Sequence, residues 1–145
     1  MIAGDGECRR DLERQARELG LDGSVHFLGA RTDVDSVLRA ADVAALSSDR
    51  EGSPLLVFEC MANNTPLVAT AVGGIPDVVE DGRTGVLVPR RDVRALADGM
   101  ITLLTDPGRR LRMAAAAREA LRRYTIDATV TRVADLYESL TLRAR

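Results

Sequence analysis

Residues 43–70 read VAALSSDREGSPLLVFECMANNTPLVAT, and this stretch decides the fold. Its two ends, residues 43–46 and 67–70, are short apolar runs typical of buried β-strands. Between them a helix is predicted over residues 53–62, because the serine that opens it is a good N-cap and the proline after it is favoured at the first helical position. A strand, a helix and a second strand in this order predict a βαβ unit with parallel strands.

The same alternation continues on both sides of this unit. The remaining elements are expected to be a strand ending at residue 3, a helix over 7–20, a strand over 24–28, a helix over 33–41, a short helix after residue 76, a strand over 86–88, and helices over about 92–104, 107–122 and 127–142. Alternating strands and helices predict an α/β fold, a Rossmann-like parallel sheet with helices on both faces. The strands are nearly all apolar, as expected when both faces are covered. We expect one domain over residues 1–145, with a helical tail from about residue 92.

Composition excludes several classes of protein. The chain has 145 residues, of which 46% are hydrophobic and 29% charged, as in ordinary globular domains. A net charge of −2 makes nucleic acid an unexpected partner. No apolar run approaches the roughly 18 to 20 residues that cross a bilayer, and no secretory leader opens the sequence. We therefore expect a cytoplasmic protein.

The cysteines and histidine do not suggest a metal centre. Cys8 and Cys60 are far apart and have no CxxC spacing, so they are predicted to be free thiols in a reducing compartment. Together with the lone His26 they are too few and too scattered for zinc, and no metal is expected. All 20 basic residues are arginine, so no lysine is available to anchor a phosphate.

The loop between the first strand and the helix of the βαβ unit is the expected ligand site. In parallel sheets, ligands bind beyond the carboxyl ends of the strands, and a helix N-terminus offers free N–H groups to an anion. Gly52 would let the backbone approach a ligand closely. Glu51, just before the helix, would compete with a phosphate and is better suited to binding sugar hydroxyls beside one.

Glu59 is the one carboxylate in the otherwise apolar helix sequence LLVFECMA. A helix that is apolar on all faces is expected to be buried, and a buried carboxylate needs partners. The vicinal hydroxyls of a ribose would satisfy it. The alternative is that Glu59 points to solvent or pairs with a structural arginine, and spacing alone leaves both open.

The pattern S-x-x-x-E-G-x-P-L-x-x-x-E, with seven residues between Glu51 and Glu59, resembles the EX7E motif of retaining glycosyltransferases of family 4. The further matches follow in the family's order: IAGDG at 2–6, VHFLG at 25–29, AADV at 40–43, PLVAT at 66–70, GGIP at 73–76 and GRTGVLVP at 82–89. One such motif is weak, whereas the ordered set is specific.

The resemblance implies the GT-B fold, in which two Rossmann-like domains face each other across a cleft. The chain is similar to the C-terminal half, the nucleotide-sugar-binding domain, without that half's first strand. By resemblance, Glu59 would hold the ribose and Glu51 would contact the donor sugar as the candidate catalytic residue. The loop from Gly29 to Arg31 would meet the base, and the turn from Gly4 to Gly6 would line the cleft floor.

The donor itself is implied to be a nucleoside-diphosphate sugar, with no metal and no further cofactor. The backbone at the start of the helix would lie along the diphosphate and sugar, which adds Gly52, Ser53, Pro54 and Leu55 to the donor-binding residues. Pro54 has no N–H, so the donors would come from its neighbours.

Two departures from the family bear on the fold. Asn64 stands where the family has a glycine, and asparagine tolerates left-handed backbone better than most residues. The family's first strand and its diphosphate-binding Arg/Lys pair would precede Met1, as would the acceptor-binding domain. Without that strand, residues 2–3 and 43–46 are expected to flank a gap. We therefore predict a marginal chain that aggregates or pairs with another chain.

We interpret the chain as the donor-binding half of a retaining glycosyltransferase that moves a sugar to an acceptor hydroxyl in glycan or glycolipid synthesis. The chain alone is expected to be inactive, and its partner is the missing acceptor domain or a chain supplying it. Two alternatives stay open: a sugar-nucleotide epimerase of the same fold, and a non-catalytic nucleotide-binding or partner fragment.

The tail helices carry a basic run: Arg109, Arg110, Arg112, Arg118, Arg122 and Arg123. A solvated face is the usual interpretation, and docking on acidic lipid at the inner face of the cell membrane is the alternative. Tyr124 and Tyr137 are predicted to be packing residues of the tail helices.

Overall fold

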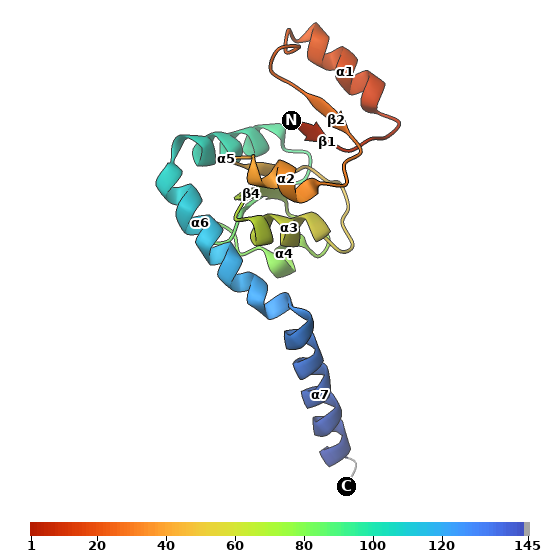
Figure 1. The fold of residues 1–145 in the computed structure, drawn as a ribbon, viewed down its shortest axis with the longest axis vertical. Helices are drawn as coiled ribbons and strands as arrows, with labels where there is room; N and C mark the ends of the chain where they lie inside the picture. The colour runs from red at the N-terminus through yellow and green to blue at the C-terminus, as the bar shows by residue number, and fades with distance from the viewer. Residues whose placement is uncertain (144–145) are drawn as a thin grey trace. The chain divides into compact units, whose positions relative to one another are not determined.

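The computed structural model describes residues 1–143, which form two compact units (Figure 1). The first unit is Met1–Val34, and the second begins at Asp35. Each unit has its own parallel sheet.

The first unit is a small strand–helix–strand element. Strand β1 (Ile2–Ala3) is followed by helix α1 (Arg9–Glu18) and strand β2 (Phe27–Gly29). The two strands pair in parallel, with Ile2 opposite Phe27 and Ala3 opposite Gly29. Helix α1 is exposed over most of its surface and buries Ala16. The short strands and single buried helix residue give this unit little core of its own.

The second unit is built on three parallel strands in the order β3–β4–β5. They are β3 (Ala44–Leu46), β4 (Leu67–Thr70) and β5 (Val86–Val88). The helices are α2 (Val34–Arg39), α3 (Leu55–Asn63), α4 (Ile75–Val78), α5 (Val93–Thr105), α6 (Pro107–Ala120) and α7 (Ile126–Arg143), with the 3-10 helix η1 (Leu121–Tyr124) between α6 and α7. Helices lie on both sides of the sheet, which confirms the predicted α/β class (Figure 1).

The core lies between the sheet and helices α5 and α6. Val68 and Val88 from the strands pack with Leu103 of α5 and Met113 of α6, and all four are buried. All four residues of β4 are buried, which explains its nearly continuous apolar sequence. The central strand thus carries the packing that holds the unit together.

Two arginines of the basic run have structural roles, so the prediction of a merely solvated face is wrong for them. Arg110 donates to the carbonyls of Leu103 and Leu104, at 3.0 and 2.8 Å, and so satisfies the free C-terminal carbonyls of α5. Arg118 donates to the carbonyl of Ala62 near the end of α3. A guanidinium fork suits this task because it offers several donors in one plane.

The two tyrosines differ. Tyr124 packs as predicted: its ring lies 5.2 Å from that of Phe58, and its hydroxyl donates to the carbonyl of Asp77 at 3.1 Å. Tyr137 does not pack, since it is 69% exposed on α7.

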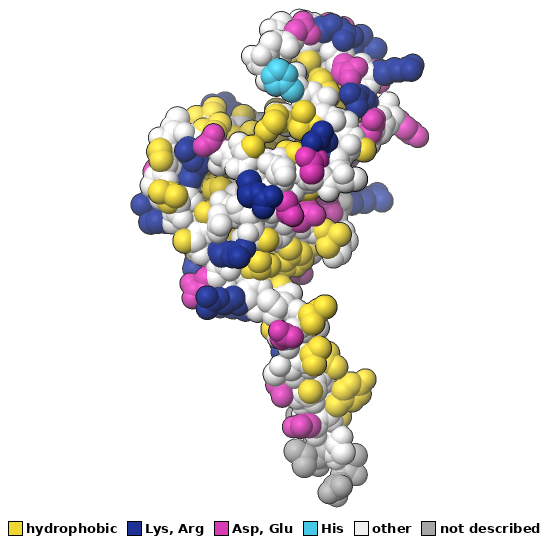
Figure 2. Space-filling view, viewed as in Figure 1, with side chains coloured by type: hydrophobic (Ala, Val, Ile, Leu, Met, Phe, Trp, Pro, Cys, Tyr) yellow, Lys and Arg dark blue, Asp and Glu magenta, His cyan; other side chains and the backbone are white. Residues whose placement is uncertain are grey.

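Helix α7 carries an exposed apolar face (Figure 2). We call this set of residues the α7 apolar face: Ile126, Val130, Val133, Leu136, Tyr137 and Leu140. Most of them recur every three or four residues, which is the spacing of one helix side. A contiguous exposed apolar surface is typical of an interaction site. None of the described helices is long and apolar enough to cross a membrane.

The strands pair within each unit, β1 with β2 in the first and β3 with β4 and β4 with β5 in the second. The gap expected where the family has its first strand, and its consequence for stability, stay predictions.

The core assignment predicts unequal effects at two neighbouring leucines. Leu103→Ala should lower the free energy of unfolding by about 2 to 5 kcal/mol, because it leaves a cavity at a fully buried position. Leu104→Ala, at an exposed position one residue on, should change it by less than about 0.5 kcal/mol. Urea unfolding followed by circular dichroism measures both, and equal losses would contradict the packing described.

Candidate functional site

The loop over residues 47–54 leaves the carboxyl end of β3 and leads into α3. The predicted cap is wrong by one residue: Pro54, not Ser53, occupies the N-cap, and α3 begins at Leu55. The chain is still turning at Pro54, which has a non-helical ψ of 73°, and the Ser53 carbonyl accepts the Leu55 N–H at 2.9 Å. No side chain caps this helix end.

The N-terminus of α3 offers free backbone donors. Within residues 1–143, the N–H groups of Gly52, Ser53 and Leu56 donate no hydrogen bond to the protein. Gly52 and Ser53 are also exposed. Free N–H groups at the positive end of a helix dipole form a site for an anion.

Glu51 is held in this loop by its neighbours. Its carboxylate oxygen Oε1 accepts the Ser48 hydroxyl at 2.6 Å. The Ser48 carbonyl in turn accepts the hydroxyl of Thr70, a buried residue at the end of β4, at 2.7 Å. The Glu51 side chain is therefore tied through Ser48 to the central strand, and it is half-buried.

The loop after β4 packs directly against the backbone of Glu51. Gly73 has a φ of +54°, and a Cβ at this position would lie 1.7 Å from the Glu51 carbonyl oxygen. A Cβ at Gly74 would lie 3.1 Å from the Gly52 carbonyl oxygen. In the sequence these glycines belong to a family motif, and nothing there indicates that they support the Glu51 loop.

Glu59 lies on the outward side of α3. It is half-buried, and Leu55, one turn earlier on the same side, is 67% exposed. The expectation that α3 is buried on all faces is therefore wrong. Among the described residues, no hydrogen bond or ion pair engages the Glu59 carboxylate, so a structural arginine partner does not hold. The other alternative, that Glu59 points to solvent, fits its place on the outward side of α3. The adjacent Cys60 thiol faces inward, and burial, then the nearby Glu59 charge, raises its pKa to about 12.

Asn64 ends α3 as predicted. Its φ of 58° and ψ of 32° are left-handed, the conformation for which the family has glycine.

The remaining predicted residues lie in the first unit. Gly4, with a φ of +126°, donates its N–H to the Gly29 carbonyl at 2.8 Å, which joins the ends of β1 and β2. Gly4 and Gly6 line a cavity of about 270 Å³ within this unit. Arg31 pairs with Asp33 at 2.6 Å, which holds the pKa of that carboxyl below its usual range. Gly4, Gly6 and Gly29 thus lie in the first unit, whereas the segment from Glu51 to Glu59 lies in the second.

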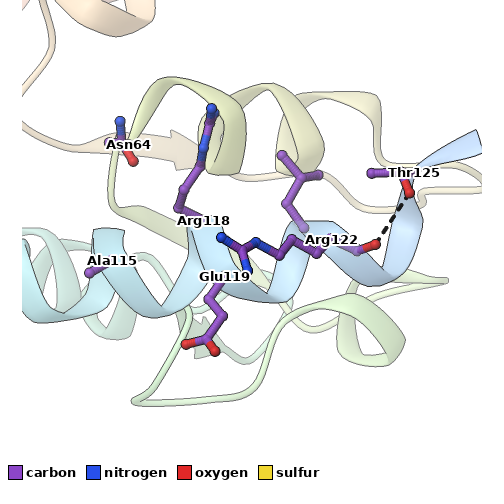
Figure 3. A pocket seen from close by; sticks show the side chains of 7 residues that line it. Asn64, Ala115, Arg118, Glu119, Arg122 and Thr125 are labelled. Carbon is purple, nitrogen blue, oxygen red and sulfur yellow. Dashed lines mark hydrogen bonds between the residues drawn. The ribbon is translucent and has the colours of Figure 1, made fainter. Parts of the chain in front are cut away.

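A concavity elsewhere in the second unit contains none of the predicted donor-binding residues (Figure 3). It measures about 700 Å³ and is lined by Asn64, Ala115, Arg118, Glu119, Leu121, Arg122 and Thr125. It lies at the C-terminal end of α3, whereas the free N–H groups lie at the other end. No group of three His, Cys, Asp or Glu side chains that could hold a metal occurs in the described part of the chain.

Residues 1–120 match the model of the family described as glycosyl transferases group 1. The chain belongs to this family. It is 39% identical over 131 residues to a D-inositol 3-phosphate glycosyltransferase of Corynebacterium urealyticum, covering 89% of this chain and 31% of that protein. It is also 34% identical over 145 residues to an α-D-kanosaminyltransferase of Streptomyces kanamyceticus, covering 98% of this chain and 38% of the other.

Solved structures agree with this assignment. Anabaena HepE in complex with UDP superposes with a TM-score of 0.86 at 28% identity, over 94% of this chain and 40% of that one. The C-terminal domain of a group 1 glycosyl transferase from Francisella tularensis gives a TM-score of 0.75 at 28% identity, over 81% and 63% of the two chains. The fold corresponds to the C-terminal half of the GT-B enzymes, and the chain spans about a third of the length of the curated relatives named above.

The packing of Gly73 against Glu51 predicts a large difference between two glycines. Gly73→Ala should lower the free energy of unfolding by about 2 to 5 kcal/mol, because the cost of a left-handed backbone is added to the cost of the overlap between the new Cβ and the Glu51 carbonyl oxygen. Gly82→Ala has a similar φ of +73° but open space around the Cβ, and should cost only about 1 to 2 kcal/mol. Chemical denaturation of both variants measures the difference, and equal costs would mean that the Glu51 carbonyl is not packed there.

Proposed function

We propose that this chain is the donor-binding half of a retaining glycosyltransferase of the family 4 type. The whole enzyme would transfer a sugar from a nucleoside-diphosphate sugar to an acceptor hydroxyl, with retained configuration, in glycan or glycolipid synthesis. The observation that carries the proposal is the free N–H groups at the start of α3, flanked by a fixed Glu51 and an unpaired Glu59. UDP bound to the similar HepE supports a nucleotide donor.

Each part of the donor has a chemical counterpart in these residues. The diphosphate would accept hydrogen bonds from Gly52, Ser53 and Leu56, beside Pro54 and Leu55, at the positive end of α3. Glu59 would accept the two ribose hydroxyls, which supply the partners that its carboxylate lacks within the protein. Glu51, with one oxygen engaged by Ser48, would use the other on the donor sugar.

The chemistry of the chain's own groups is positioning and charge stabilisation. As the sugar leaves, negative charge grows on the diphosphate, and N–H groups that are already oriented stabilise it without reorganising. We assign contact with the base to Gly29 and Arg31 and the cleft floor to Gly4 and Gly6. No metal is required by this proposal, because backbone donors and the helix dipole would face the anion.

The acceptor would be bound by a further domain or by a partner chain. The α7 apolar face is a suitable surface for that partner, since burying its six exposed side chains would remove them from water. Contact of Arg112, Arg122 and Arg123 with acidic lipid at the inner membrane face stays a prediction, as does a cytoplasmic location.

The ribose assignment is tested at Glu59. Glu59→Gln should weaken UDP binding by about 1 to 3 kcal/mol, the range for hydrogen bonds to a charged group, which corresponds to roughly 5- to 150-fold. Calorimetric titration of the chain with UDP measures it, with Glu119→Gln, an exposed residue of α6, as the matched control. Equal affinity of Glu59→Gln and the original chain would remove the ribose role.

The sugar assignment is tested at Glu51. Glu51→Ala should reduce affinity for UDP-glucose more than affinity for UDP, because it removes a contact to the sugar alone. In the assembled enzyme, Glu51→Ala should reduce turnover of the sugar nucleotide by a larger factor than it reduces affinity for UDP. If the affinities for UDP and for UDP-glucose fell by the same factor, Glu51 would contribute to nucleotide binding or to the shape of the loop, and not to sugar binding. Formation of an epimer from labelled UDP-glucose, in place of transfer or hydrolysis, would favour the epimerase alternative.

A further inference from the structure

A bidentate ion pair joins the turn after β5 to the loop that carries Glu51. The Arg91 Nε lies 3.2 and 3.1 Å from the two carboxylate oxygens of Asp49, and its Nη2 lies 2.6 Å from Oδ2. The neighbouring Arg90 places Nη1 3.4 Å from the Asp49 carbonyl oxygen. Two arginines thus bind both the side chain and the backbone of one loop residue.

The backbone of Arg91 is unusual for an arginine. Its φ is +63°, in the left-handed region that glycine and asparagine favour, and holding another residue there costs free energy. The chain continues at once into a capped helix, because the Asp92 carboxylate accepts the Ala95 N–H at 2.8 Å. A glycine would adopt this turn without strain but would lack the side chain that binds Asp49.

The pair does not serve as an element of the core. The Arg91 and Asp49 side chains are 71% and 51% exposed, and ion pairs at such positions stabilise folded proteins little. The pair holds a short segment, residues 48–51, whose two ends are held by other contacts. Ser48 is held by Thr70 on one side, and Glu51 is held against Gly73 on the other. Asp49 lies between them and is attached to Arg91 on the solvent side.

We propose that Arg91, acting through Asp49, is a positioning residue that holds the 47–54 loop in the conformation that presents Glu51 and the α3 N-terminus to the donor. This rests on the proposed function for the identity of the donor. Neither Arg91 nor Asp49 is required to touch the ligand. The loop would otherwise need to be ordered at the moment of binding, and that ordering would lower affinity.

Arg91→Gly separates positioning from stability, because it removes the side chain and relieves the left-handed backbone together. The unfolding midpoint of the variant should be unchanged or raised. The backbone NMR order parameters of Arg50, Gly52 and Ser53 should fall, and UDP-glucose affinity should fall by about two- to fivefold, as expected for an exposed pair. NMR relaxation, calorimetry and thermal melting give the three readouts.

Two further variants complete the test. The double variant Asp49→Arg with Arg91→Asp restores a pair of opposite charge and should recover most of the lost loop order and affinity. Arg83→Ala removes a different exposed ion pair, with Glu80, and should alter neither the loop order parameters nor binding. Asp49→Asn, which leaves the backbone at Arg91 intact, repeats the test if Arg91→Gly does not fold.

The outcomes distinguish this proposal from the proposed function. If the original chain does not bind UDP-glucose, the donor assignment fails in this chain, and the loop order parameters in Arg91→Gly still decide whether Arg91 holds the loop. Unchanged order parameters in Arg91→Gly would overturn the positioning role, whatever the ligand does. Lower order parameters in the loop, with most of the loss recovered in the double variant, would support it.

Discussion

The contact between the Glu51 carbonyl and Gly73 is the constraint on which the site depends. A Cβ at Gly73 would lie 1.7 Å from that oxygen, so the two loops meet backbone to backbone with no room for a side chain between them. One loop follows β3 and the other follows β4, which are paired in parallel from Ala44–Leu67 to Leu46–Ala69. The ends of two neighbouring strands therefore fix where Glu51 lies and where α3 begins. The Thr70–Ser48 hydrogen bond adds a second tie at the same sheet edge.

Helix α3 joins a buried side to an exposed side that carries the proposed ribose-binding residue. Val57, Cys60 and Met61 are buried, while Leu55 and Glu59 lie on the outward side. Packing of the inward side positions the outward side, so the unpaired Glu59 carboxylate is held by apolar contacts made elsewhere on the same helix. The raised pKa of Cys60, about 12, reflects this inward environment first. A rigid helix is a better support for a binding residue than a loop would be.

Local patterns predicted the fold well because the information is local. Strand runs, the order of elements and the left-handed Asn64 follow from residues close in sequence. The cap at Ser53 was wrong by one residue because the tight turn at Pro54 delays the helix, which serine and proline preferences do not encode. The burial of α3 was overestimated because residue type alone does not say which side of a helix meets a neighbour.

Contacts between distant residues could not be predicted. Asp49 and Arg91 are 42 residues apart, and nothing in the sequence around either residue indicates that the two form a pair. Arg118 reaches a carbonyl 56 residues away, and its place in a basic run suggested only solvent. The α7 apolar face has the spacing of a packed helix, and the sequence therefore predicted packing at Tyr137 that residues 1–143 do not provide. These features need the positions of whole elements, which local periodicity does not supply.

The most direct test of the account is NMR amide mapping of the full chain during titration with UDP. The account predicts saturable shifts at Gly52, Ser53 and Leu56, and around Glu59, because the diphosphate and ribose would lie along the start of α3. The Leu103 amide, in the core of the unit, should not shift. Shifts centred on Asn64, Arg118 and Arg122, at the other end of α3, would contradict the central claim, as would the absence of any saturable shift in the 47–56 segment.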